Sequence, residues 1–203
     1  MKRLALALTL MMVFCAASTF AAPKKGTMKD SRDGKTYKTV QIGSQTWMAE
    51  NLNYKAEESF CYKDDAANCA KYGRLYTWKT AQKACPAGWH LPSRAEWETL
   101  IVAVDGSIVK YALENTAGSK LKSSSGWKEN GNGTDAFGFS ALPVGTRSYD
   151  GRYYSEGDVA YFWNSTEDDS DFAQHVSLLY RNDDAGLGWF SKDYGFSVRC
   201  LKD

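Results

Sequence analysis

Cys85-Pro-Ala-Gly-Trp-His-Leu-Pro-Ser-Arg-Ala-Glu-Trp97 is the stretch around which the rest of the chain is organised. It places one cysteine, two prolines and two tryptophans close together, and each of these residues restricts the backbone or favours burial. Pro86 disfavours helical geometry in the residue before it, so a short helix predicted over residues 76–84 must stop at Cys85. The stretch is therefore a rigid corner and not a flexible linker.

A longer helix starts inside the same stretch. Ser93 stands three residues before Glu96, which is the spacing of a capping box. Trp, Leu, Ile and Val then occupy positions 97, 100, 101 and 104, the spacing of one buried helical stripe. Asp105-Gly106 ends this helix, and a third, weaker helical segment is predicted over residues 108–114.

Short strands account for most of the remaining chain. Residues 37–42 and 45–48 are β-rich runs joined by Gly43-Ser44, which is the pattern of a hairpin. Further strand-like runs cover residues 137–143, 161–163, 175–180 and 196–201. The sequence therefore predicts a single α+β domain over residues 33–203, with two helices, twisted antiparallel β-structure and long loops.

Composition narrows the class of partner. The chain has 203 residues, about one domain's length, and its 25 basic and 24 acidic side chains nearly cancel. No charge excess favours nucleic acid or an anionic membrane.

The first residues have the pattern of a signal peptide. Met1-Lys2-Arg3 precedes an apolar run over residues 4–17, and Thr19-Phe20-Ala21 offers small residues for cleavage after Ala21. The run is shorter than the roughly 20 residues that span a bilayer, so no membrane span is expected after cleavage. We predict a signal peptide over residues 1–21, which includes Cys15, an exposed linker over residues 22–32, and a secreted, periplasmic or cell-surface location.

Export makes disulfides the default for Cys61, Cys69, Cys85 and Cys200. Three pairings of four cysteines are possible. Cys61 and Cys69 flank a polar loop that can close locally, which leaves Cys85 with Cys200. The spacing of a zinc site is missing, so no metal is predicted at these cysteines.

Six segments taken in chain order carry a more specific pattern. They are WMAENLNY at 47–54, GRLYTW at 73–78, the opening stretch at 85–97, GFSALP at 138–143, FWNSTE at 162–167 and YGFSVRC at 194–200. In this order they resemble the Fibrobacter succinogenes major paralogous domain, a family of exported bacterial proteins. The resemblance implies a C-type lectin-like fold, in which a helix cysteine bridges to the last strand, and it supports the Cys85–Cys200 pairing.

A looser resemblance tests whether the chain is an enzyme. Residues 90–97 and 195–199 are similar to segments of formylglycine-generating enzymes, which hold copper with a reactive cysteine pair near the end of the domain. Here the only late cysteine is Cys200, which is expected to be bridged. The shared residues are therefore interpreted as fold markers, and the chain is predicted not to be an enzyme.

The remaining polar candidates favour structural interpretations. His90 precedes a helix, with no nucleophile or second histidine nearby. His175 and Val176 point to opposite faces of their strand, so His175 is predicted to be exposed. The acidic run at residues 167–171 has oxygen atoms that suit calcium. Because the sugar-binding motifs of calcium-dependent lectins are missing, a solvated loop is preferred and no cofactor is predicted.

Aromatic residues in the second half are the strongest functional signal. Rings beside hydrogen-bonding groups suit sugars or a protein partner, because they give contact area at low entropy cost. The candidate ligand-binding residues are Tyr149, Arg152, Tyr153, Tyr154, Arg181, Asn182 and Trp189. Trp163 is predicted to lie in the core instead. We therefore expect an exported binding module for an extracellular glycan or protein, with an enzyme of the formylglycine-generating type or a structural cell-envelope protein as alternatives.

Overall fold

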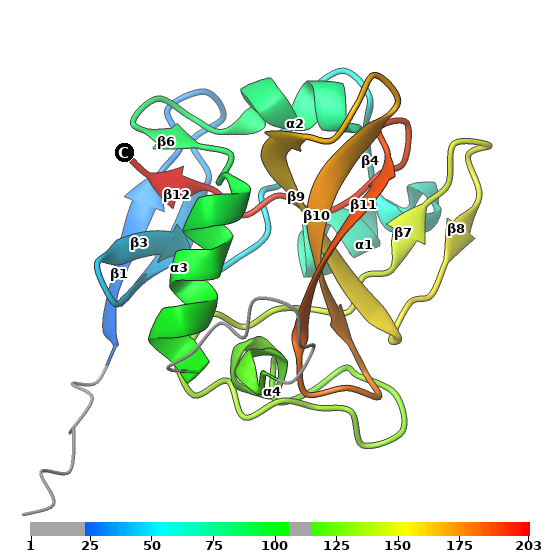
Figure 1. Ribbon diagram of the computed structural model, residues 1–203. Helices are drawn as coiled ribbons and strands as arrows, with labels where there is room; N and C mark the ends of the chain where they lie inside the picture. The colour runs from blue at the N-terminus through cyan, green and yellow to red at the C-terminus, as the bar shows by residue number, and fades with distance from the viewer. Residues whose placement is uncertain (1–22, 106–114) are drawn as a thin grey trace, which may run out of the picture.

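A computed structural model describes residues 23–105 and 115–203, and Figure 1 shows their arrangement. The predicted signal peptide with Cys15 and the helix predicted over residues 108–114 lie outside the described residues. The described part is a mixed α+β structure with antiparallel sheets, few helices and two disulfides, as the sequence predicts.

A five-stranded sheet brings the two ends of the domain together. Its strand order is β1-β2-β3-β12-β6. The strands are β1 (Lys24–Lys29), β2 (Thr36–Ile42), β3 (Gln45–Met48), β12 (Leu201–Lys202) and β6 (Trp89–His90). The predicted hairpin is confirmed as β2–β3, and Gly43 in its turn has a φ of +59°, which favours glycine.

Strand β1 corrects the linker predicted over residues 22–32. Five of its six residues are exposed, so the segment shows no alternation of apolar and polar residues that would reveal a strand. It is held instead by backbone pairing with β2, in a register that runs from Lys24 opposite Gln41 to Lys29 opposite Thr36. Arg32 in the following turn donates hydrogen bonds to Asp30 and to the carbonyl oxygen of Ala84.

The other sheets are smaller. A three-stranded sheet has the order β11-β10-β9, and two strand pairs join β4 to β5 and β7 to β8. The bounds are β4 (Ser59–Phe60), β5 (Leu75–Tyr76), β7 (Thr146–Arg147), β8 (Tyr153–Tyr154), β9 (Val159–Glu167), β10 (Phe172–Leu179) and β11 (Ala185–Ser191).

Both predicted helices of the first half are confirmed. They are α2 (Trp78–Ala84) and α3 (Arg94–Asp105). In α3 the Glu96 carboxylate accepts a hydrogen bond from the Ser93 backbone N–H at 2.7 Å, and the Ser93 hydroxyl accepts one from the Glu96 N–H at 3.3 Å. These contacts form the predicted capping box. The predicted stripe of α3 is buried, and the helix lies between the two larger sheets (Figure 1).

Three short helices were not predicted from the sequence. They are a 3₁₀ helix (Tyr62–Asp64), α1 (Ala66–Tyr72) and α4 (Ala117–Leu121). The 3₁₀ helix and the first turn of α1 together replace most of the predicted polar loop between Cys61 and Cys69. Helix α1 continues beyond Cys69 to Tyr72. Helix α1 begins after Asp65, whose side chain accepts a hydrogen bond from the Ala67 N–H, and it is too short to show a helical repeat of apolar residues in the sequence.

Two aromatic clusters form most of the core. In the first, Trp97 contacts Trp47 and Phe162 with ring centroids 4.7 and 5.5 Å apart. In the second, Trp163 stacks on Phe196 at 4.3 Å. The prediction that Trp163 lies in the core is confirmed, since its side chain is fully buried.

Both disulfides form with the expected pairing, Cys61–Cys69 and Cys85–Cys200. The first closes a local loop, with the cysteines 8 residues apart, and the second joins positions 115 residues apart. The second bond therefore ties the end of α2 to the segment that enters the last strand.

We predict that loss of the two disulfides has unequal effects. In the chain-entropy model the Cys85–Cys200 bond contributes about 5 kcal/mol to the free energy of unfolding and the Cys61–Cys69 bond about 2.5 kcal/mol. Cys85→Ala/Cys200→Ala should therefore lower stability about twice as much as Cys61→Ala/Cys69→Ala in urea-induced unfolding. An equal or larger loss in the Cys61/Cys69 variant contradicts the expectation.

Candidate functional site

The structure divides the predicted ligand-binding residues among three places. The first group is in or beside the β7–β8 hairpin: Tyr149, Arg152, Tyr153 and Tyr154. Arg181 and Asn182 lie in the turn between β10 and β11, and Trp189 lies near the far end of β11. At about 3.3 Å per residue, Trp189 is at least about 13 Å along the strand from that turn. The residues therefore do not form one site.

Tyr153 makes structural contacts in the hairpin. Its hydroxyl donates a hydrogen bond to Asp64 at 2.6 Å, and its ring meets the edge of Tyr62 with centroids 5.2 Å apart. Burial, together with the Asp64 carboxylate, raises the pKa of Tyr153 to about 12. Tyr153 therefore joins the hairpin to the 3₁₀ helix beside Cys61, whereas Tyr149 and Tyr154 are 70% and 45% exposed.

A buried lysine holds the β10–β11 turn. The Lys122 ammonium donates hydrogen bonds to the carbonyl oxygens of Leu179 and Asn182, at 3.1 and 2.8 Å. Burial lowers the pKa of Lys122, and its amine lies over the ring of Trp127. Sequence reasoning missed this role because a single lysine after a short helix carries no sign of burial. The backbone of Asn182 is thus part of the frame, while its side chain is exposed.

Trp189 is the most open of the predicted ring positions on a strand. Its side chain is 60% exposed, and its ring meets Phe172 edge to face with centroids 5.2 Å apart. Gln174 stands opposite Trp189 in the β10–β11 register. The Gln174 amide oxygen accepts a hydrogen bond from Arg94 at 3.3 Å, so polar groups border the exposed ring.

The exposure of Trp189 follows from the strand's period of two. Leu187 and Trp189 share one face of β11. Leu187 packs against the first aromatic cluster, whereas Trp189 lies two residues nearer the strand end and remains open. Phe190 points to the other face and packs against the second cluster. We define Trp189, Phe172, Gln174 and Arg94 as the tryptophan surface.

His175 corrects a prediction. It was expected to be exposed, but it is 6% exposed and its ring contacts Tyr161 and Phe196, with centroids 5.1 and 5.5 Å apart. The prediction was wrong because β10 packs against a core on both faces, so residues opposite Val176 are buried too. Burial lowers the pKa of His175 to about 4, and its Nδ1 has no hydrogen-bond partner among the described residues.

His90 joins the two ends of the domain. Its Nδ1 lies 2.6 Å from the Asp203 carboxylate and its Nε2 lies 2.9 Å from that of Glu96. Partial burial opposes protonation, but the hydrogen bonds and charges of the two carboxylates outweigh it, so the pKa of His90 is raised. This ion-paired position agrees with the structural role that the sequence favoured.

The acidic run at residues 167–171 wraps around a lysine of the chain itself. The Lys192 ammonium contacts the Glu167 carboxylate and donates hydrogen bonds to the carbonyl oxygens of Asp169 and Ser170, at 2.6 and 2.9 Å. These are oxygen atoms of the type that calcium prefers. Within residues 23–105 and 115–203, no group of three or more His, Cys, Asp or Glu side chains is arranged to hold a metal ion.

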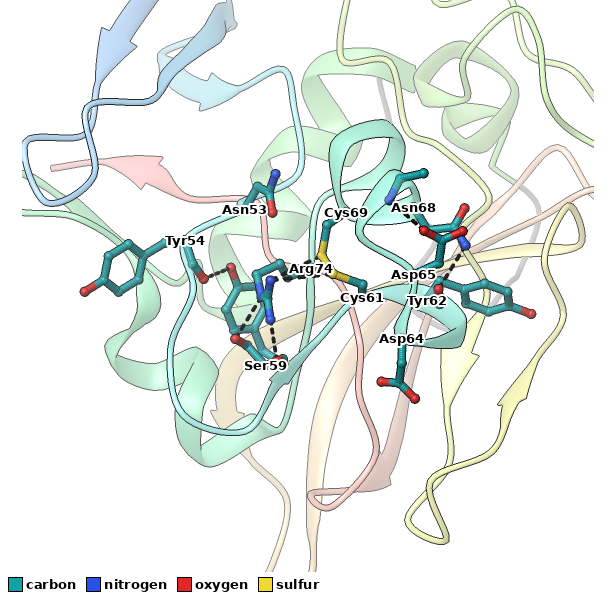
Figure 2. Close-up of a disulfide and its surroundings, with 12 residues drawn as sticks. Asn53, Tyr54, Ser59, Cys61, Tyr62, Asp64, Asp65, Asn68, Cys69 and Arg74 are labelled. Carbon is teal, nitrogen blue, oxygen red and sulfur yellow. Dashed lines mark hydrogen bonds between the residues drawn. A yellow bond between two sulfur atoms is a disulfide. The ribbon is translucent and has the colours of Figure 1, made fainter.

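Arg74 fixes the small disulfide loop, as Figure 2 shows. Its Nε and Nη2 donate hydrogen bonds to the hydroxyl and carbonyl oxygens of Ser59, at 2.9 and 2.7 Å, and its Nη1 lies 3.3 Å from the sulfur of Cys69. The arginine therefore holds β4 against the disulfide and the start of β5. Sequence reasoning did not single out Arg74, because nothing in its neighbours indicates this contact.

Comparison with known proteins identifies a family. The model of the Fibrobacter succinogenes major domain matches residues 40–202. Strand β1 and the first half of β2 therefore precede the matched region. No curated protein and no solved structure matches the chain.

We predict opposite effects of the two histidines on stability as the pH falls. His175 has a pKa of about 4 in the folded chain against an ordinary value of 6.5. Between these two pH values the histidine is protonated in the unfolded chain and neutral in the folded chain. Its contribution is present above pH 6.5 and falls by about 3 kcal/mol between pH 6.5 and 4. His90 has a raised pKa, so its contribution is present below pH 6.5 and lost as pH rises through its folded pKa.

The measurement is urea-induced unfolding of each variant between pH 7 and 5. His175→Phe should flatten the fall in stability on acidification, and His90→Gln should make it steeper. The slope is compared, not the absolute stability, because a phenyl ring changes the packing. An unchanged slope in His175→Phe contradicts the assignment.

Proposed function

The chain belongs to the Fibrobacter succinogenes major domain family, and we propose that it is an exported, non-catalytic binding module. It presents the loops and strand ends of its second half to an extracellular or cell-surface ligand, either a glycan or a protein. The observation that carries this proposal is the 60% exposed ring of Trp189 on a rigid sheet.

Two features support export. Disulfides form and persist in oxidising compartments, and all four cysteines between residues 61 and 200 are paired. The first 21 residues have the charge, length and cleavage pattern of a signal peptide. Among the described residues, no helix has the length and apolar character needed to cross a membrane.

We also infer a C-type lectin-like fold. Its support is the bond from Cys85, directly after α2, to Cys200, directly before β12. The strands at the two ends of the domain also share one sheet.

The tryptophan surface offers apolar area for ligand binding and hydrogen-bonding groups that can orient the ligand. A large aromatic side chain that is 60% exposed leaves roughly 150 Å² for a ligand to cover, and burying that area corresponds to about 4 kcal/mol. Gln174 and Arg94 beside the ring offer an amide and a guanidinium for hydrogen bonds. A ring bordered by such groups suits the apolar face of a sugar or a backbone segment of a protein.

The enzyme alternative has weaker support. An enzyme of the formylglycine-generating type needs reactive cysteines near the end of the domain. Cys200 is fully buried and bonded to Cys85, so its thiol is not available for metal binding. This favours binding over catalysis.

We predict that Trp189→Ala weakens ligand capture about tenfold or more and shifts the melting temperature by less than about 2 °C, because an exposed ring contributes little to folding. The measurement is a glycan and cell-envelope binding screen of the exported protein, followed by thermal unfolding. Val102→Ala is the control, because Val102 is a 40% exposed apolar residue on α3.

Two outcomes count against the proposal. If Trp189→Ala unfolds the protein, the ring is part of the core. If it binds every ligand of the screen as the original protein does, the tryptophan surface is not the ligand site.

A further inference from the structure

A polar cleft lies away from the tryptophan surface. It has a volume of about 690 Å³ and is bordered by the β1–β2 hairpin, the segment after β3, the end of α1 and the loop at residues 135–142. We propose that this cleft binds a segment of an acidic polysaccharide, with the ammonium groups of Lys25 and Lys71 contacting its carboxylate or sulfate groups. This site is independent of the proposed function at Trp189.

The lining of the cleft is basic. Four lysines contribute to it, against the two carboxylates of Glu50 and Asp135. The lysines come from separate parts of the chain: Lys25 from β1, Lys35 from the hairpin turn, Lys38 from β2 and Lys71 from α1. A concave surface with one predominant sign of charge attracts ligands of the opposite sign.

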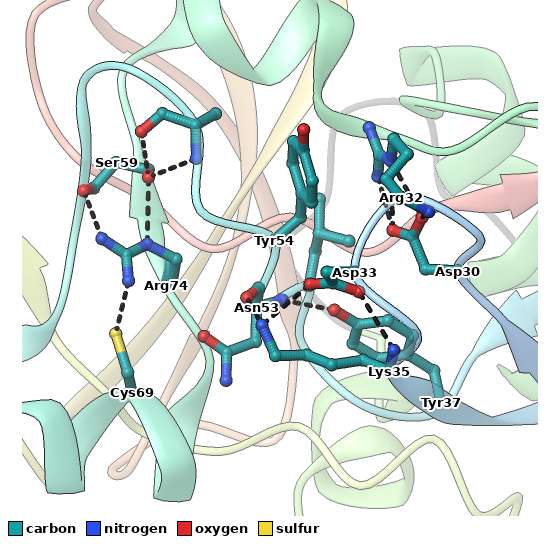
Figure 3. A network of polar contacts seen from close by, with 12 residues as sticks. Asp30, Arg32, Asp33, Lys35, Tyr37, Asn53, Tyr54, Ser59, Cys69 and Arg74 are labelled. Carbon is teal, nitrogen blue, oxygen red and sulfur yellow. Dashed lines mark hydrogen bonds and ion pairs between the residues drawn. The ribbon is translucent and has the colours of Figure 1, made fainter.

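Two of the lysines already have partners. The Lys35 ammonium donates hydrogen bonds to the Asp33 carboxylate at 2.8 Å and to the carbonyl oxygen of Asn53 at 2.7 Å, as Figure 3 shows. The Lys38 ammonium lies 3.7 Å from the Glu50 carboxylate.

Lys25 and Lys71 differ from these two because neither is paired with a carboxylate; the Lys71 ammonium lies 4.3 Å from the centroid of the Tyr72 ring. Within the described part of the chain, no salt bridge joins either ammonium group to a carboxylate. Asp135, which also lines the cleft, is occupied by Ser140, whose backbone N–H and hydroxyl donate to its two oxygens at 2.7 and 2.6 Å. The charges of these two ammonium groups are therefore not neutralised by a carboxylate in contact with them, and they outnumber the single charge of Asp135.

Neutral groups of the cleft suit hydroxyls and not apolar side chains. Asn53 uses its backbone N–H and carbonyl for Tyr37 and Lys35, and its side-chain amide has no partner among the described residues (Figure 3). Tyr37 and Tyr72 line the cleft but are only 4% and 5% exposed, so they offer little ring surface. A peptide anchored by apolar side chains finds no pocket here.

Arg199 makes the cleft floor rigid and adds positive charge behind it. Its guanidinium is fully buried and donates hydrogen bonds to the Asn51 side chain at 2.6 Å and to the carbonyl oxygens of Phe139 and Ser140 at 2.5 and 2.9 Å. Asn51 and Ser140 both line the cleft. Burial lowers the pKa of Arg199 to about 9, which leaves the group charged at neutral pH.

The side chain of Lys25 packs against the backbone of the loop that borders the cleft. Gly138 has a φ of +71°, and a Cβ atom there would lie 3.3 Å from the Cε of Lys25, so the lysine stem runs along this glycine. Across β1, a Cβ atom at Gly26 would lie 3.0 Å from the Thr39 hydroxyl. The family match begins at residue 40, so the lysines at 25, 35 and 38 precede it. One wall of the cleft therefore comes from residues that precede the matched region, and the other walls come from residues within it.

The test compares two double variants of the full exported protein. Lys25→Ala/Lys71→Ala should bind polygalacturonate and dextran sulfate about tenfold or more weakly than the original protein at low salt. Lys24→Ala/Lys79→Ala removes the same charge from β1 and α2 outside the cleft and should bind within about twofold. Trp189→Ala should bind these polymers unchanged, which separates this site from the tryptophan surface.

Neutral dextran and poly-glutamate are the comparison polymers, and neither should bind as tightly as polygalacturonate. The proposal is overturned if the original protein does not bind the acidic polysaccharides, or if the two double variants lose equal affinity. It is also overturned if poly-glutamate binds equally well, because the site then recognises charge on any acidic polymer. Thermal unfolding of each variant shows whether it is folded.

Discussion

The segment at residues 195–201 passes through the middle of the domain, and most other elements depend on it. Its backbone forms hydrogen bonds with Tyr76 of β5, with Trp163 of β9 and with Met48 and Leu52 near β3. Leu201 then pairs with both β3 and β6. The disulfide at Cys200 closes a loop of 115 residues to Cys85, so it removes a large conformational entropy from the unfolded chain. It also holds this segment in register with its partners.

Arg199 lies within this segment and shows how strongly it is constrained. The Arg199 guanidinium is fully buried and has no carboxylate partner in the described structure. Such a group lowers the free energy of unfolding unless each of its N–H donors is hydrogen-bonded. Here the acceptors are carbonyl groups of Met48, Phe139 and Ser140 together with the Asn51 amide. These acceptors come from separate segments, so the arginine fixes the loop at 135–142 against the end of β3.

The sequence predicted those elements whose signals are local. The α3 capping box at Ser93 and the hairpin at Gly43 depend on neighbouring residues, and both appear as expected. Strand β1 was missed because its exposed side chains carry no alternation, and His175 was misplaced because one strand cannot reveal that both faces are covered. The cleft could not be predicted, since its lysines come from segments that only the fold brings together. Likewise, the separation of Trp189 from the β7–β8 hairpin follows from sheet topology.

The two candidate surfaces depend on the frame in different ways. The tryptophan surface lies within the matched region and is formed by β10, β11 and the start of α3, so it belongs to the domain itself. The cleft needs β1, which adds to the edge of the five-stranded sheet before residue 40 and is held by backbone pairing alone along most of its length. Backbone pairing places few demands on side chains, so the residues of β1 can change without loss of the strand. Charged side chains on a strand of this kind can therefore line one side of the cleft without altering the core of the disulfide-bonded domain.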